Sequence, residues 1–472
     1  MTGGRAGRRL VCPATASERP SARPPVRLTA ELLLFLAACR PPGAGVVALE
    51  GATLIDGSGR APMKDAVILV KDGHVLAVAR ANDITVPRGA REVSLVGKTL
   101  IPGLIDAHAH VERWAAERYL AWGVTTVRDL GAGGTDSSLA LRTDFNMGSV
   151  LGPRMYTAGA MIDGAPPTYP TATGVATAGE ARRAVDQHVV AGTDLIKIYT
   201  KLTPELLGPL LNEATTLRIP VAAHLGKTDA VTAAKAGVSS LEHMAGVVQA
   251  AVPDPANYLK AHDRFLTGWT LEEMGWTALD SASVARVART LAAARVAVVP
   301  TLVLHEMLAR LDNPTLLLRP GIEDVPASAA SVRDVAGLLR RSGWGAAQLA
   351  AFRRARPRQN QFLRDFKRAG GLIAAGTDAA NQLLVPGLSL HEEMSLLVAA
   401  GLTPLEAITA ATRTGAHLLH ADSLGTIAPG QVADLVALDA NPAADISATR
   451  RIALVMVRGR LIEPDSLRRT WH

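Results

Sequence analysis

The sequence predicts an α/β protein: a (β/α)8 barrel (TIM barrel) joined to a small β-sandwich that is built from both chain ends. Over residues 103–423, short apolar runs alternate with helical patterns, which is typical of parallel βα units. Residues 46–102 and 424–464 instead carry short strand patterns and turn signals, and neither segment alone can bury a good core. A chain of 472 residues has room for one large domain and a smaller one.

Eight apolar runs have the length and composition of buried parallel strands, and helical patterns fill most of the gaps between them. That arrangement is what a barrel of this kind requires. The gaps at 247–296 and 306–371 exceed ordinary loops, so each should contain extra helices. The expected strands are 103–107, 125–130, 155–160, 194–199, 220–223, 239–242, 297–302 and 372–376.

Capping residues mark three helix boundaries in this region. Residues 403–406 read Thr-Pro-Leu-Glu, a capping box with proline at the first helical position. Residues 270–273 carry the same Thr and Glu spacing and predict a second helix start. A third helix should begin after Asp229 and end at Gly237.

The two chain ends carry the patterns of short hairpin strands. Asp-Gly pairs separate several of the runs, and glycine there supplies the positive φ that tight turns need. We therefore expect the two ends to pair in one sandwich across the intervening domain. The expected strands are 45–55, 66–70, 74–78, 435–438, 452–457 and 461–462.

The net charge of +7 does not indicate a nucleic-acid-binding protein. Residues 1–40 hold seven arginines against two glutamates, so the remaining chain carries only about +2 and has no basic run interleaved with aromatic residues. Both cysteines, Cys12 and Cys39, also lie in this leader. A disulfide framework or a cysteine-based zinc site in the body is therefore excluded.

Residues 1–40 have features of an export signal. Arg27 precedes an apolar run, 32–38, which ends in Leu-Ala-Ala-Cys at Cys39 and is similar to a bacterial lipoprotein signal. This predicts an exported protein, periplasmic or membrane-anchored through a lipid on Cys39. The alternatives are a start at Val26 and a cytoplasmic enzyme with a disordered extension.

Histidines and an aspartate follow the predicted strands at the ends that converge in this fold. His108 and His110 lie two residues apart after the first strand, so on an extended chain both imidazoles face the same side. His224 ends the fifth strand and His243 the sixth. Asp378 ends the eighth, while Lys197 lies inside the fourth.

Taken together, these motifs resemble the amidohydrolase superfamily, in particular its imidazolonepropionase-related, prolidase-type branch. The resemblance covers roughly residues 46–464 and combines six motifs. It rests on residues 100–110, 125–129, 194–197, 223–224, 237–243 and 375–378.

The resemblance implies a centre with two divalent ions per chain, most simply zinc. It implies that His108, His110 and Asp378 bind the first ion and that His224 and His243 bind the second. It further implies that Lys197 is carboxylated and bridges the two ions. If Lys197 is instead structural or faces the substrate, the site holds one ion.

The residue types agree with this implied chemistry. Neutral imidazoles and a carboxylate suit Zn²⁺, which polarises a carbonyl and lowers the pKa of water. Asp378 can accept the proton of that water and pass it to the leaving group. Tyr199 and His305, next to the fourth and seventh strands, are candidates for substrate contact.

The expected function is metal-dependent hydrolysis of a carbon–nitrogen bond in a small amide or dipeptide, with Xaa-Pro dipeptides as the first candidates. Alternatives at the same centre are cyclic amides, lactones and organophosphates. Imidazolonepropionase itself is disfavoured because its branch lacks the bridging lysine. A non-catalytic surface binding protein is the alternative outside the enzymes. For the oligomeric state, a homo-oligomer is an alternative to a monomer. Residues 391–393, half of a zincin motif, are interpreted as a solvated helix start.

Overall fold

In the computed structural model, residues 43–131 and 133–471 are described. The leader, with Cys12 and Cys39, lies outside these residues, so the export signal and the lipid anchor stay predictions. Within the described ranges, no helix has the length and apolar character that crossing a membrane would require.

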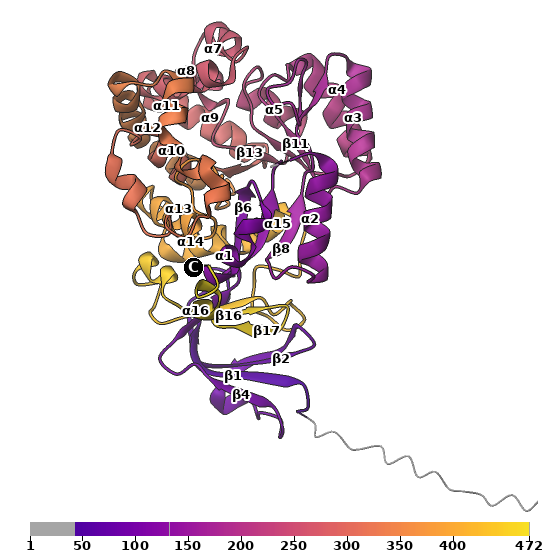
Figure 1. Cartoon of the computed structure of the whole chain (residues 1–472), viewed down its shortest axis with the longest axis vertical. Coiled ribbons are helices and arrows are strands. Elements are labelled where there is room, and N and C mark those ends of the chain that lie inside the picture. Colours follow the sequence, from indigo (N-terminus) through magenta and orange to yellow (C-terminus); the bar gives the residue numbers. More distant parts are fainter. Residues whose placement is uncertain (1–42, 132, 472) are drawn as a thin grey trace, which may run out of the picture. The chain divides into compact units, whose positions relative to one another are not determined.

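Strands from both chain ends form one sheet, in which β5 pairs antiparallel with β15 (Figure 1). The prediction that the ends join is therefore confirmed. The β5–β15 bonds join the two halves in a single sheet, and whether this sheet folds over into a sandwich stays a prediction. The strands in spatial order are β17 (Arg460–Ile462), β16 (Ile452–Val457), β15 (Leu435–Leu438), β5 (Thr99–Pro102), β1 (Val46–Leu54), β2 (Met63–Lys71) and β3 (His74–Arg80), with β4 (Arg91–Ser94) paired to β1.

Both faces of this sheet are buried at β15. Successive side chains of a strand point to opposite faces. Leu435 and Ala437 pack with Leu100 in a core that belongs to the sheet itself. Val436 and Leu438 join the largest hydrophobic cluster, which includes the helices and parallel strands of the body. The sheet is thus attached to the body through alternate residues of one strand.

The body contains two parallel sheets. Seven of the eight predicted strands coincide with observed ones, whereas β9 and β10 were not predicted. Asp194, just before β11, donates a backbone hydrogen bond of 3.0 Å to Thr157 of β8 and so links the two sheets. The strands are β6 (Leu104–Ala109), β7 (Val124–Asp129) and β8 (Arg154–Thr157) in one sheet, and β10 (Thr173–Val175), β9 (Ile162–Gly164), β11 (Ile196–Ile198), β12 (Val221–Ala223), β13 (Ser240–Glu242) and β14 (Ala297–Val299) in the other.

The eighth predicted strand, 372–376, is not a regular strand, but it lies between β14 and β6. Val298 donates a backbone hydrogen bond of 2.9 Å to Leu372, and Ala107 donates one of 2.9 Å to Ala375. The segment therefore hydrogen-bonds to one strand of each sheet. These bonds support the predicted closed barrel, which stays a prediction.

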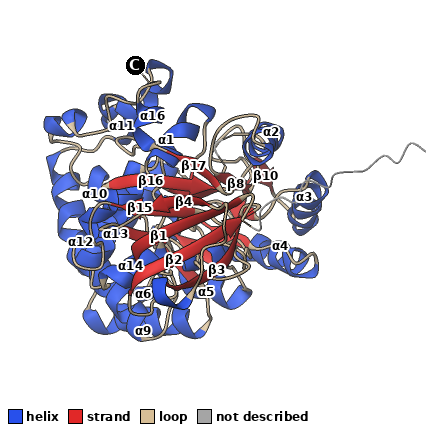
Figure 2. Cartoon of the chain, turned by 90° about the horizontal axis from the view of Figure 1, so that it is seen from below, coloured by secondary structure: helices blue, strands red, loops and turns tan. Residues whose placement is uncertain are grey.

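Helices contact the parallel strands, and in the view from below they surround the shared sheet (Figure 2). The extra helices expected in 247–296 and 306–371 are present, and so are the predicted caps at Asp229 and Thr403. The cap predicted at Thr270 is wrong because that helix already begins at Phe265. The helices are α1 (Ala116–Ala121), α2 (Thr135–Met147), α3 (Ala178–Ala191), α4 (Pro204–Thr216), α5 (Ala230–Ala236), α6 (Val247–Ala251), α7 (Ala256–Ala261), α8 (Phe265–Gly275), α9 (Ser281–Ala293), α10 (Leu302–Leu308), α11 (Val335–Ser342), α12 (Ala346–Arg368), α13 (Leu388–Ala399), α14 (Pro404–Ala410), α15 (Arg413–Leu418) and α16 (Pro464–Arg468).

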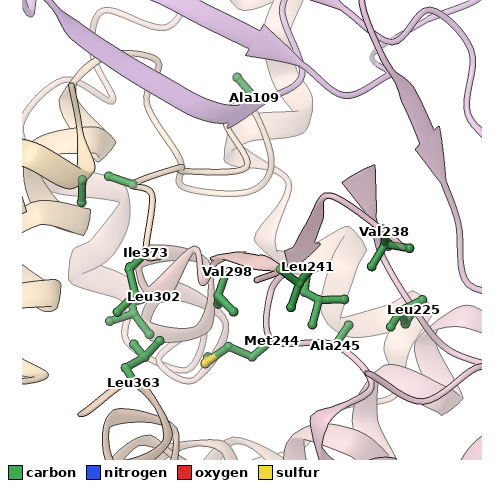
Figure 3. Close-up of a cluster of buried hydrophobic side chains, with 14 of the residues drawn as sticks. Ala109, Leu225, Val238, Leu241, Met244, Ala245, Val298, Leu302, Leu363 and Ile373 are labelled. Carbon is green, nitrogen blue, oxygen red and sulfur yellow. The ribbon is translucent and has the colours of Figure 1, made fainter. Parts of the chain in front are cut away.

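The main core holds the strands against these helices. Figure 3 draws part of it, including Leu241 of β13, Val298 of β14, Leu302 of α10 and Leu363 of α12. All four side chains are fully buried. Burial of such side chains contributes roughly 1.5–3 kcal/mol each, so this packing fixes the strand ends that carry the polar residues described below.

Val436→Asp tests the attachment of the sheet to the body. Val436 is fully buried, so a carboxylate there should lower the free energy of unfolding by about 2–4 kcal/mol. Val96→Asp is the matched control, because Val96 is 75% exposed. Urea unfolding should show a lower midpoint for Val436→Asp only. Equal midpoints for the two variants would contradict the packing described here.

Candidate active site

His108, His110 and Asp378 form a group that could hold a metal ion, and one ligand atom from each lies within 4.8 Å of the others. Asp378 Oδ1 is 3.0 Å from His108 Nε2 and 3.0 Å from His110 Nε2. The two histidines come from the end of β6, where residues i and i+2 share a side. This is the arrangement that the His-x-His spacing predicted.

Asp378 is brought to β6 by the backbone of segment 372–378. Its amide donates a hydrogen bond of 2.7 Å to the carbonyl of His108, and its Oδ2 accepts one of 2.5 Å from Asn381 Nδ2. Its φ of 65° lies in the left-handed region, which costs a non-glycine residue free energy and recurs at functional sites. The carboxylate is thus held in one orientation from two sides.

His224 and His243 extend the cluster on the far side of His108. The ring centroids of His108 and His243 are 4.5 Å apart, and so are those of His243 and His224. Burial lowers the pKa of both His224 and His243 well below the usual value, which keeps them neutral. Thr301 Oγ1 lies 2.7 Å from His243 Nδ1 and leaves Nε2 of that ring available for a ligand.

Lys197 of β11 lies in the same cluster with a buried amine. Its Nζ has no hydrogen-bond partner among the described residues. Burial lowers the pKa of Lys197 to about 8, although Glu242 and Asp378 partly oppose this. A buried, unpartnered amine is costly in the free protein, so this position suits a group that is modified or that contacts a ligand.

A buried carboxylate orients His108 from behind. Glu242 Oε2 lies 2.7 Å from His108 Nδ1, and Glu242 Oε1 accepts a hydrogen bond of 2.8 Å from Arg128 Nη2. Burial alone would raise the pKa of Glu242, but Arg128 and His108 hold it well below the usual range. The charged carboxylate favours a proton on Nδ1 and leaves Nε2 of His108 to face Asp378.

Sequence reasoning missed Glu242, although it directly precedes His243. Arg128 acts here through Glu242. Asp106 was also missed: it accepts hydrogen bonds from the Thr377 amide (3.1 Å) and hydroxyl (2.6 Å), which fixes the loop that leads to Asp378. The alternation along β6 could have indicated Asp106, because it shares a side with His108.

The candidate metal ligands lie in the wall of a cavity of about 330 Å³. All six predicted metal ligands line it, and so does Tyr199, one of the two predicted substrate residues. The Tyr199 ring lies 4.8 Å from the ring of His224. Sequence reasoning did not identify the other aromatic residues of the wall: Phe265 and Trp269 lie on α8 and Trp344 just before α12, within the two long insertions, and Tyr169 lies in the loop between β9 and β10.

His305, the other predicted substrate residue, does not line this cavity. Its ring stacks on Trp269 at 5.5 Å, so the indole stands between it and the open space. His305 Nδ1 is 2.7 Å from Glu273 Oε1, and Nε2 is 3.1 Å from the carbonyl of His243. The structure therefore gives His305 a role in supporting the Trp269 and His243 positions rather than in direct contact.

The interpretation of residues 391–393 as a solvated helix start is wrong. His391 and Glu393 are fully buried in α13. His391 Nε2 is 2.9 Å from the carbonyl of Trp122, and Glu393 accepts a hydrogen bond of 2.7 Å from the Val303 amide. The buried face of α13 thus carries two polar side chains, and both contact backbone groups of other segments.

Comparison with known proteins identifies the family. The profile of the Amidohydrolase family matches residues 99–462. The chain belongs to the amidohydrolase family. This match and the hydrolases among its structural neighbours support an enzyme that acts on carbon–nitrogen bonds, as the sequence predicted.

Individual relatives share 40% or less of their aligned residues with this chain. The chain is 40% identical over 86 residues to imidazolonepropionase from Deinococcus deserti, which is 17% of this chain and about a fifth of the length of that relative. The structure of a proposed prolidase from Bifidobacterium longum is similar with a TM-score of 0.67, 26% identity and coverage of 91% of this chain and 100% of that one. The structure of bottromycin amidohydrolase is similar with a TM-score of 0.69, 24% identity and coverage of 92% of this chain and 90% of that one.

Glu242→Gln tests whether the carboxylate behind His108 prepares it for a metal. The neutral amide no longer fixes the imidazole tautomer, so affinity for Zn²⁺ should fall about 10–100-fold. Glu323→Gln, at an exposed position, is the matched control. Zinc titration against a competing chelator measures the affinity, and thermal unfolding of the metal-free variants reports any loss of fold. An unchanged zinc affinity would show that Glu242 has no part in the site.

Proposed function

We propose that this amidohydrolase is a metal-dependent enzyme that hydrolyses the carbon–nitrogen bond of a small amide, with Asp378 as the proton-transferring group. The observation that carries the proposal is the convergence of His108, His110 and Asp378, whose ligand atoms lie within 4.8 Å in the wall of a cavity. Two imidazoles and a carboxylate are a donor set that divalent zinc commonly takes.

Two buried polar atoms support this fit. Lys197 Nζ is buried and has no hydrogen-bond partner among the described residues, and the buried His108 Nε2 faces the Asp378 carboxylate, whose Oδ1 is 3.0 Å away. Each would gain a partner in the metal-bound protein, His108 directly and Lys197 after modification. Bound there, a divalent ion would supply Lewis-acid polarisation of the amide carbonyl and would lower the pKa of water.

Asp378 is suited to accept and deliver the proton. Burial would raise its pKa, but the surrounding histidines hold the pKa of Asp378 well below the usual value. The carboxylate is therefore charged and ready to accept a proton from the attacking water at Oδ1 or Oδ2. It can then release that proton to the nitrogen of the leaving amine, which general acid–base catalysis requires.

We further propose that Lys197 is carboxylated and that the site holds two zinc ions. With a pKa of about 8, roughly a tenth of the amines are neutral at pH 7, far more than for an exposed lysine. The neutral amine would attack CO2, form an N–C bond and lose one proton. The product is an anionic carbamate whose two oxygens could serve two ions. His224 and His243 would be the remaining ligands of the second ion.

The sequence motifs and the likeness to the proposed prolidase make Xaa-Pro-type dipeptides the first substrate class to test. Cyclic amides, lactones and organophosphates remain alternatives at the same centre. A non-catalytic surface binding protein is the competing class. It would be expected to lack at least one of the ligands that this chain retains.

Chelation tests the proposed function. Removal of metal should abolish amide turnover, and added Zn²⁺ should restore it, on a panel that also contains a lactone and a phosphotriester. Asp378→Asn should lower kcat by about 10²–10⁴-fold because the amide cannot accept the proton. Asp422→Asn, at an exposed position, is the control. Protein that binds no metal and turns over nothing on the panel would instead support the binding role.

Lys197→Ala decides between one ion and two. Loss of the bridge should lower zinc content from about two ions per chain to one or fewer, and kcat should fall by orders of magnitude. Lys235→Ala, on the exposed side of α5, should change neither. Elemental analysis of the purified variants measures the ions. Full zinc content and full activity in Lys197→Ala would rule out the bridge.

A further inference from the structure

The cavity has an aromatic wall, made by Tyr169, Tyr199, Phe265, Trp269 and Trp344. Tyr199 and Phe265 have ring centroids 5.6 Å apart, and Tyr169 and Tyr199 are 5.5 Å apart. Phe265 and Trp269 each lie 5.7 Å from the ring of His224. The wall therefore begins directly at the candidate metal ligands, where the groups next to the scissile bond would lie.

Aliphatic side chains complete the apolar surface. Leu266, Leu304, Leu308 and Leu338 line the same cavity, and Met161 does too. The neutral polar side chains of Thr171, Ser331, Asn381 and Gln382 also line the cavity, beside this apolar surface. Such a surface favours a ligand group that is itself apolar, since burial gains roughly 25 cal/mol per Å² of apolar area.

The described lining residues include no arginine, and their only lysine is Lys197. Lys197 lies with the candidate metal ligands. Arg341, whose charge reaches Tyr169, is exposed and forms an ion pair of 3.1 Å with Asp334. A substrate carboxylate in the apolar part of the cavity would find no cation there.

The remaining charged lining residues are acidic. Glu112 lines the cavity along with Asp378. Burying an anion without a cation or several hydrogen bonds costs several kcal/mol. The cavity wall therefore disfavours an anionic group beside the scissile amide.

We infer that the substrate is an amide whose group next to the scissile nitrogen is apolar, aryl or alkyl, and bears no carboxylate. The inference rests on the proposed hydrolase function and narrows it. It argues against Xaa-Pro dipeptides, which place a free carboxylate one carbon away from that nitrogen. The same wall that excludes them offers stacking surfaces for a ring.

Two substrates that differ only in the carboxylate provide the test: N-acetylphenethylamine and N-acetyl-L-phenylalanine. With zinc-loaded enzyme, kcat/KM should be at least tenfold higher for N-acetylphenethylamine. An equal or higher value for N-acetyl-L-phenylalanine would overturn the inference. Quenching of tryptophan fluorescence, from Trp269 and Trp344 in the wall, gives Kd for both compounds on the same protein. If neither is turned over, the proposed function fails for these amides, but the order of the two Kd values still decides the inference.

A cation placed in the wall should change the preference. Leu338→Arg introduces a guanidinium among the lining residues, and Leu338→Met is the matched uncharged control. The ratio of the two kcat/KM values, or of the two Kd values, should shift toward N-acetyl-L-phenylalanine by about tenfold or more in Leu338→Arg only. If the ratio stays at the wild-type value in a folded Leu338→Arg protein, the substrate group does not reach this wall and the inference is overturned.

Discussion

The pairing between the backbones of His108 and Asp378 is the constraint on which the rest of the site depends. The Asp378 amide donates to the His108 carbonyl at 2.7 Å, and this bond brings together residues 270 positions apart in the chain. Together with the bond from the Thr377 amide to the same carbonyl, it brings the His108 and His110 imidazoles to the carboxylate. The parallel strands and the helices packed against them hold His108 and Asp378 in place, and so fix both ends of this bond.

The pKa values of two buried carboxylates, Asp106 and Glu242, are shifted in opposite directions. Asp106 and Glu242 are both fully buried, yet the pKa of Asp106 rises to about 7 while that of Glu242 falls well below its usual range. Burial acts on both in the same direction, and the difference comes from Arg128 beside Glu242. One carboxylate therefore holds a loop through hydrogen bonds with Thr377, whereas the other places a fixed negative charge behind His108.

Much of the fold and the histidine cluster could be predicted from the sequence, because both depend on local patterns. The spacing of His108 and His110 follows from the two-residue period of a strand, and the strand ends in a parallel sheet converge. Apart from Tyr199, the aromatic wall could not be predicted, since Phe265 and Trp269 reach the cavity only through the packing of a long insertion. His305 was misplaced for the same reason: the sequence does not reveal that Trp269 stands in front of it.

The shared sheet also constrains how this protein is made. Leu100 of β5 pairs with Ala437 of β15, 337 residues later in the chain. At roughly 5–20 residues per second, synthesis of that stretch takes about 20–70 s. During this time the N-terminal strands have left the ribosome, but the edge of β5 has no partner. An unpaired strand edge is a template for aggregation. The nascent chain must therefore keep this edge covered until its last forty residues emerge.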